Sequence, residues 1–230
     1  MKSILPFVFT TIFFMSCTKK DLTHDGLVHI IDDKFNLGTD FWVADFADYP
    51  VGQEDFYSLK SSHAKLPAPL DQNDGAIFIS GNNHSDDLFM FLKKKTTGLK
   101  PNTTYKATFD IELTSNAPSN AVGIVGPPGE SVFLGIGITS TEPQKVNANG
   151  TYRMNINKGN QSREDTDRKI IGNIANGTDQ SEYVLLKKNG EIAFTTDSSG
   201  TVWVSISTDS GFEGVTSLYY SAIKIHFYEI

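Results

Sequence analysis

Residues 98–113, GLKPNTTYKATFDIEL, contain the segment that decides the fold class. Between Tyr105 and Leu113, apolar side chains alternate with Lys, Thr, Asp and Glu at every position. This period of two is typical of a β-strand that buries one face. Pro101 and Asn102 precede the strand, and both residue types favour tight turns. The sequence therefore predicts a strand that starts after a turn and contributes alternate side chains to a core.

Short segments of the same kind recur along the 230-residue chain, and no convincing amphipathic helix lies between them. Asn189-Gly190 separates two of these segments and is a strong signal for a hairpin turn. Roughly ten to thirteen short strands at hairpin spacing predict an all-β fold, a two-sheet antiparallel β-sandwich in one domain over residues 28–230. Strands are expected over residues 28–31, 76–80, 87–93, 104–114, 121–125, 131–139, 152–157, 169–174, 183–187, 191–196, 201–208 and 217–228.

Two glycines, Gly135 and Gly137, fall on the same face of the strand predicted over residues 131–139. Glycine weakens a strand because it has no side chain to pack, so two on one face mark a close approach of something else. We expect a neighbouring element of the fold there, and a ligand is the alternative.

The first residues have the composition of an export signal. Lys2 is followed by an apolar run over residues 4–15 that is too short to span a bilayer, which predicts a signal peptide over residues 1–16. Cys17, the only cysteine of the chain, comes directly afterwards. Residues 17–27 are mostly polar, have no periodicity and are predicted to be a tether.

The sequence Phe14-Met15-Ser16-Cys17 resembles a bacterial lipobox, with Phe14 in the place of the usual Leu. This resemblance implies that Cys17 is the site of lipid attachment. The protein would then be an exported lipoprotein of the cell envelope, anchored in the lipid membrane and facing the periplasm or the cell surface. An ordinary signal peptide with an incidental cysteine is the alternative.

Composition and motifs exclude several classes of function. The formal net charge is −7, whereas a nucleic-acid partner requires clustered Lys and Arg, so no nucleic acid is expected. The sequence has no Gly-x-Ser-x-Gly, no phosphate-binding glycine loop and no His-Glu-x-x-His. A non-catalytic protein is predicted. A glycosidase with a pair of carboxylates across a cleft is the alternative.

Two polar segments contain candidate binding residues. The first, GNNHSDD at residues 81–87, joins two apolar strands and offers donors and acceptors suited to sugar hydroxyls. The second, at residues 155–163, runs from a predicted strand into a polar loop. Solvated loops are the structural alternative for both. The candidates from these segments are Asn82, Asn83, His84, Asp86, Asn155 and Arg163.

Aromatic side chains add two further candidates, because sugars stack on rings through their C–H faces. Trp42 and Trp203 are the only tryptophans of the chain. Trp203 alternates with Val202 and Val204, so it is predicted on the less apolar face of its strand. Aromatic residues that cover an edge of the core are the alternative.

Residues 98–113, together with GTVWVS at 200–205 and SLYYSAIKI at 217–225, resemble jelly-roll carbohydrate-binding modules of the galactose-binding-like superfamily. The resemblance implies a jelly-roll sandwich that binds a polysaccharide without hydrolysing it. A structural or protein-interaction module of the cell envelope, with an envelope protein as its partner, is the alternative, because the same sandwich serves many functions.

The resemblance also bears on a structural calcium ion. Many members of the superfamily have an acidic residue in the closing strand where this chain has Ser221, and that departure argues against bound calcium. Asp32, Asp33 and Glu229 still provide oxygen atoms that calcium prefers, although their spacing does not demand a site. No cofactor is therefore predicted, and the presence of a metal stays open.

Overall fold

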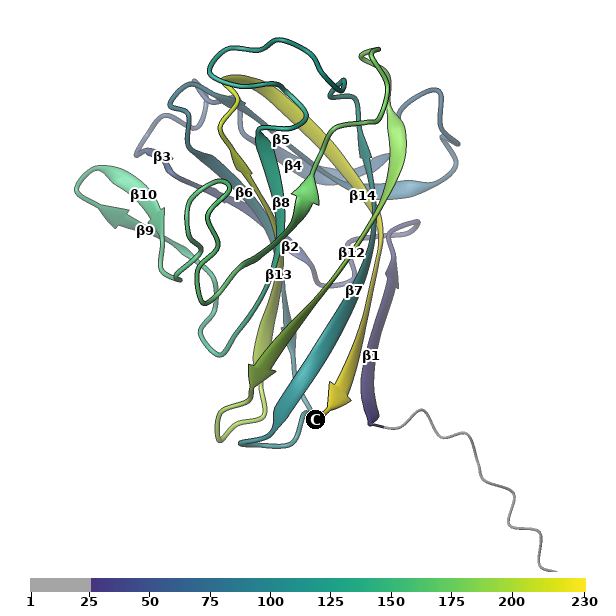
Figure 1. Ribbon diagram of the computed structural model, residues 1–230, viewed down its shortest axis with the longest axis vertical. Coiled ribbons are helices and arrows are strands. Elements are labelled where there is room, and N and C mark those ends of the chain that lie inside the picture. Colours follow the sequence, from purple (N-terminus) through teal and green to yellow (C-terminus); the bar gives the residue numbers. More distant parts are fainter. Residues whose placement is uncertain (1–25) are drawn as a thin grey trace, which may run out of the picture.

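The computed structural model describes residues 26–230, and every regular element in this part of the chain is a β-strand (Figure 1). The predicted signal peptide at residues 1–16, Cys17 and most of the predicted tether lie outside the described residues. Leu27, which the sequence placed in the tether, is the first residue of β1. Within residues 26–230, no helix is long and apolar enough to cross a membrane.

One large sheet, called here the β14 sheet, is six-stranded with the order β12-β7-β14-β5-β4, and β1 also pairs with β14. The strand β14 changes partner along its length: its first part pairs with β5, and its second part pairs with β1. The change follows an irregularity of its pairing with β7 between Tyr220 and Ala222, which leaves Ser221 out of register. The strands are β1 (Leu27–Lys34), β4 (Lys60–Lys65), β5 (Gly75–Asn83), β7 (Thr104–Ser115), β12 (Val184–Thr195) and β14 (Gly214–Glu229).

The second large sheet, called here the β13 sheet, is five-stranded with the order β11-β8-β13-β6-β2. Its strands are β2 (Val43–Ala47), β6 (Leu88–Thr96), β8 (Val132–Thr139), β11 (Lys169–Asn173) and β13 (Val202–Ser210). A small third sheet contains β3 (Tyr49–Pro50), β10 (Thr151–Met154) and β9 (Lys145–Ala148) in that order. All pairings in the three sheets are antiparallel, so the predicted antiparallel β-sandwich is confirmed.

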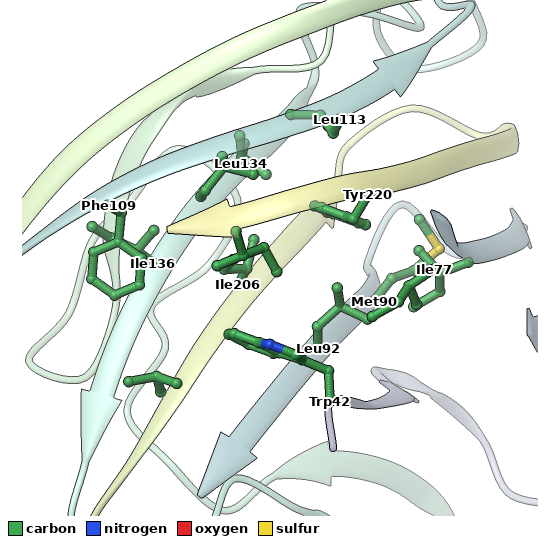
Figure 2. Packing of buried hydrophobic residues seen from close by; sticks show 14 of the residues in the cluster. Trp42, Ile77, Met90, Leu92, Phe109, Leu113, Leu134, Ile136, Ile206 and Tyr220 are labelled. Atoms are coloured by element: carbon green, nitrogen blue, oxygen red, sulfur yellow. The ribbon is translucent and has the colours of Figure 1, made fainter. Parts of the chain in front are cut away.

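The core lies between the two large sheets. Phe109 and Leu113 of β7 belong to the same buried cluster as Leu134 of β8 and Ile206 of β13 (Figure 2). The alternation that predicted these strands places one set of side chains in this layer and leaves the other set on the outer faces. Burying this many branched and aromatic side chains is the main driving force for the fold.

Three sequence predictions about strands were wrong. No turn exists at Asn189-Gly190, because β12 continues through it and pairs with β7 from end to end. Gly190 is needed for packing instead, since a Cβ atom there would lie 2.4 Å from Ile171 Cγ2. Residues 121–125 form only an isolated bridge from Ile124 to Glu213. The sequence also missed β4, whose polar KSSHAK sequence does not look like a strand.

The prediction for Gly135 and Gly137 is confirmed, because a neighbouring segment packs directly on both. A Cβ atom on Gly135 would lie 2.5 Å from Arg168 Nε, and one on Gly137 would lie 2.5 Å from the Asp167 carbonyl oxygen. The chain leading into β11 therefore lies against the outer face of the β13 sheet.

Candidate functional site

Residues 140–168 cover much of the outer face of the β13 sheet. Besides Arg168, this segment contributes Met154 of β10, which packs on a small buried cluster of Ala47, Phe89 and Phe91. The hairpin of β9 and β10 projects from the side of the sandwich (Figure 1). The outer face of this sheet is thus a second packed layer rather than an open surface.

A cavity of about 550 Å³ opens between this segment and the strand ends that carry Asp48 and Asp87, and we call it the polar cleft. Such a volume lies within the range of small-molecule binding sites. Hydrogen-bonding and charged side chains dominate its lining. Those at its exposed rim are Arg153, Asn157, Asn160, Arg163, Glu164 and Asp165.

The floor of the polar cleft is a group of buried charges. Lys158 Nζ donates to Asp209 Oδ2 at 2.8 Å, and the two side chains are 9% and 0% exposed. The same ammonium lies 2.9 Å from Asp48 Oδ2 as an ion pair without hydrogen-bond geometry. Because buried ions lose their hydration, such pairs contribute little net stability, and removing one partner is costly. These ion pairs fix the relative positions of Lys158, Asp48 and Asp209.

Arg153 extends the charged group to the cleft wall. Its Nη1 atom donates to Asp87 Oδ2 at 2.7 Å and to Asp48 Oδ1 at 3.1 Å. Burial raises the pKa of Asp87, although the hydrogen bond from Arg153 opposes the shift. Burial by itself would lower the pKa of Lys158, but the charges of Asp209 and Asp48 outweigh it and raise this pKa. Lys158 is therefore a fixed cation below the cleft.

Arg168 holds the covering segment on the sheet. Its Nε donates to Ser207 Oγ at 3.0 Å, and its Nη2 donates to the Phe133 carbonyl oxygen at 2.7 Å. The guanidinium also donates to the carbonyl oxygen of Gln161 at 3.3 Å. Burial lowers the pKa of Arg168 from its usual value. Its hydrogen bonds join two strands of the sheet to the loop that forms the cleft.

Three non-glycine residues with left-handed backbones meet beside the polar cleft. They are Asp48 with φ 63°, Asp86 with φ 56° and Gln161 with φ 50°. Gln161 connects them to the floor, because its backbone N–H donates to Asp209 Oδ2 at 2.9 Å and its Nε2 donates to the Asp86 carbonyl oxygen at 2.7 Å. Such backbones cost about 1–3 kcal/mol each and cluster at functional sites. Seven further non-glycine residues of the described chain have left-handed backbones elsewhere, so these three conformations do not by themselves identify the site.

The residues predicted from segment 81–87 occupy different places in the structure. Asp86 does not line the cleft but directly precedes the cleft residue Asp87, and its carbonyl oxygen accepts from Gln161 Nε2. Asn82 and His84 lie together beside Phe56. Asn83 is 2% exposed and donates to the carbonyl oxygens of Ser210 and Phe212, so it is a structural residue and the prediction of a ligand contact is corrected.

The second predicted segment is divided in the same way. Arg163 lines the polar cleft. Asn155 borders a separate cavity and stabilises the covering segment instead, since its Nδ2 donates to the Glu142 carbonyl oxygen at 2.9 Å and its Oδ1 accepts from the Gln144 N–H at 2.8 Å.

The two tryptophans occupy different environments, and neither lines the polar cleft. Trp42 is 3% exposed in the core and donates from Nε1 to Asp33 Oδ2 at 2.8 Å, so the prediction of a stacking surface is wrong for this residue. Trp203 lies on the outer face of β13, as expected, with Lys93 Nζ 5.6 Å from its ring centroid. It is half-buried and six positions along β13 from Asp209 of the cleft floor.

Each of the three acidic residues considered for calcium forms an ion pair with a different lysine. Asp32 pairs with Lys224 at 2.9 Å, Glu229 pairs with Lys100 at 2.6 Å, and Asp33 pairs with a lysine of β6. Across residues 26–230, no group of three or more His, Cys, Asp or Glu side chains is arranged to hold a metal ion.

No model of a known protein family matches the chain, and no curated protein matches it. Among solved structures, the CBM22-1 xylan-binding domain from Paenibacillus barcinonensis is 11% identical with a TM-score of 0.39, covering 90% of this chain and 96% of that chain. TmCBM61, solved in complex with β-1,4-galactotriose, is 12% identical with a TM-score of 0.34, covering 83% of this chain and 90% of that chain.

The enzymatically active domain of tailspike protein 4 from bacteriophage CBA120 is 8% identical with a TM-score of 0.37. That match covers 83% of this chain but only 20% of the tailspike chain. Several of the similar solved structures are carbohydrate-binding modules, with TM-scores of 0.34 to 0.39.

Proposed function

We propose that this protein is a non-catalytic carbohydrate-binding β-sandwich and that the polar cleft is its binding site. The observation that carries the proposal is an open cavity of about 550 Å³ whose rim is lined by amide, guanidinium and carboxylate groups. Sugar hydroxyls both donate and accept hydrogen bonds, so a rim with both kinds of partner suits them.

The rim is both available and supported. Asn157, Asn160 and Arg163 are exposed, and within residues 26–230 their side chains make no hydrogen bond or ion pair. The buried pair of Lys158 and Asp209 fixes the backbone below them. Ligand contacts can therefore form without first breaking internal ones, and a fixed floor lowers the entropy cost of binding.

Affinity electrophoresis tests this proposal directly. The chain from residue 18 onward contains every described strand and would be run in gels that each hold one soluble polysaccharide. We expect retardation by at least one polysaccharide and clearly less retardation of the Arg163→Ala variant. Lys65→Ala, an exposed lysine at the end of β4, is the matched control and should behave as the unaltered chain does. A folded protein that no polysaccharide retards would contradict the proposal.

We further propose that residues 1–16 are a lipoprotein signal peptide and that acylated Cys17 anchors the protein in the cell envelope. The first described residue, Gly26, lies at one end of β14, where its carbonyl oxygen accepts from the Glu229 N–H (Figure 1). At the other end of β14, Gly214 pairs with Asn83. An N-terminal anchor would therefore join the domain at the Glu229 end. The two ends of this 16-residue strand are fifteen positions apart, which corresponds to about 50 Å. An anchor at Cys17 would leave the polar cleft accessible.

Mass spectrometry of the mature N-terminus tests the anchor. We expect a chain that begins with a diacylated Cys17, and we expect Cys17→Ala to release the protein from membranes. A mature chain that starts elsewhere, or a Cys17→Ala variant that stays in the membrane, would refute it.

A further inference from the structure

An exposed aromatic pair lies next to the polar cleft. The Phe56 ring is 57% exposed and stacks on His84, with ring centroids 4.1 Å apart and an interplanar angle of 27°. His84 is exposed as well, and its Nε2 lies 2.9 Å from the Asn82 side-chain nitrogen and 3.2 Å from the Phe56 carbonyl oxygen. We call this pair the aromatic platform.

Buried aromatic residues support the platform from below. Tyr57, which is 2% exposed, meets Phe56 edge-on at 5.8 Å and His84 edge-on at 5.4 Å. Tyr57 in turn packs against buried Tyr49 at 5.8 Å. Edge-to-face contacts of this kind are favourable and define the ring orientations. The platform is therefore held in place, although its outer surface is apolar and faces water.

The platform is close to the cleft. His84 and Asp87 are three residues apart, so their Cα atoms are separated by at most about 11 Å. Asn83 fixes the turn between them, because its Oδ1 accepts from the N–H groups of Ser85 at 3.1 Å and Asp87 at 3.4 Å. Asp87 itself lines the polar cleft.

We infer that the aromatic platform is a second subsite of the polar cleft, on which a further unit of the same glycan stacks. The inference rests on the proposed function of the cleft and adds a ligand class to it: an oligosaccharide or polysaccharide rather than a single sugar. The polar rim would bind hydroxyl groups, whereas a ring surface prefers a pyranose face rich in C–H groups. Both surfaces together would bind adjoining parts of one chain.

Calorimetric titration with xylo-, manno-, gluco- and galacto-oligosaccharides of increasing length tests the inference. For the series that binds, we expect the affinity of the unaltered chain to rise between the monosaccharide and longer members. Phe56→Ala should weaken binding of the longer members about five-fold, as expected for one lost aromatic contact, and leave the monosaccharide unaffected.

Phe41→Ala is the matched control. Phe41 is 90% exposed and precedes β2, which runs from Val43 towards the cleft residue Asp48. This change also removes an exposed phenylalanine ring, but one that lies several strand positions away from the cleft, so binding should be unchanged. Phe56→Leu keeps an apolar side chain but removes the ring, so it provides a second test if Phe56→Ala fails to fold.

The outcomes separate the two proposals. If Phe56→Ala and Phe56→Leu bind every oligosaccharide as Phe41→Ala does, while Arg163→Ala weakens binding, the platform is not a subsite and the cleft proposal stands. If the folded, unaltered chain binds none of the polysaccharides or oligosaccharides, the proposed function fails and this inference fails with it.

Discussion

The ion pairs on the outer faces of the two large sheets differ in exposure: they are exposed on the β14 sheet and buried on the β13 sheet. On the β14 sheet, the ion pairs are in solvent: the side chains of Lys187 and Glu112 are 75% and 37% exposed, and those of Lys224 and Asp32 are 41% and 50% exposed. Pairs like these contribute little to stability and are screened by salt. They keep this face soluble and place no demand on its geometry.

On the β13 sheet, residues 140–168 cover the charges. Lys158 and Asp209 are 9% and 0% exposed, and Asp48 is 2% exposed. Buried charges are expensive, so a fold keeps them where geometry matters more than net stability. The polar cleft opens directly above this buried group of charges.

The largest expected effect comes from breaking a pair on each face. Asp209→Ala leaves Lys158 with a buried, poorly compensated charge and should lower the free energy of unfolding by about 3–5 kcal/mol. The equivalent change on the exposed face, Asp32→Ala, should cost less than about 1 kcal/mol. Urea unfolding of both variants measures the difference. Equal effects would mean that the two faces do not differ in the way described.

A smaller effect is expected from crowding the contact between the covering segment and the sheet. Gly135→Ala would place a Cβ atom 2.5 Å from Arg168 Nε and should destabilise the fold by about 1–3 kcal/mol. Gly38→Ala is the control, because no atom lies within 4 Å of a Cβ at that position. The midpoint temperature of thermal unfolding should be clearly lower for Gly135→Ala than for Gly38→Ala. A neutral Gly135→Ala would show that residues 140–168 are loosely placed.

The pKa values of one cleft aspartate and one exposed aspartate should shift in opposite directions. Burial raises the pKa of Asp87 in the cleft. Hydrogen bonds from Ser199 lower the pKa of exposed Asp197, which follows β12. Carbon-detected NMR titration of the side-chain carboxyl groups should therefore find Asp87 above and Asp197 below the usual carboxyl range. Asp87→Asn would confirm the assignment of its signal.

The stability consequences of these two shifts have opposite signs. Between the usual carboxyl pKa and the raised one, the folded state holds more protons at Asp87 than the unfolded state does, so this contribution falls as pH rises. The contribution of Asp197 is present above the usual pKa and is lost as pH falls through the lowered one. If the pKa of Asp87 lay below the usual range, the hydrogen bond from Arg153 would outweigh burial, which would contradict this account of the cleft wall.

Local sequence patterns were sufficient to predict the β-sandwich. The alternation from Tyr105 to Leu113 predicted β7 because each side chain of a half-buried strand reports its own face. The glycine pair in β8 predicted a close neighbour, and Arg163, which the sequence offered as a candidate binding residue, lines the polar cleft. The hairpin prediction at Asn189 failed because twelve-residue pairing with β7 overrides a local turn preference.

The buried charges could not be predicted, since they depend on contacts between distant parts of the chain. Asp209 and Lys158 are 51 positions apart, and Asp48 is much further away in sequence. The available signal was weak: Asp209 continues the outer-face series of Ser205 and Ser207, where a charge needs no explanation. Trp42 was likewise a candidate stacking residue, but tertiary packing places it in the core.

Mapping the ligand by NMR is the most direct test of the account. Amide spectra of the chain from residue 18 onward would be recorded with increasing amounts of whichever oligosaccharide it binds. We predict that the shifted signals cluster at residues 153–165, with a second group at residues 56 and 82–87. Shifts concentrated on the exposed face of the β14 sheet, or scattered without a centre, would contradict a binding site built over the buried charges.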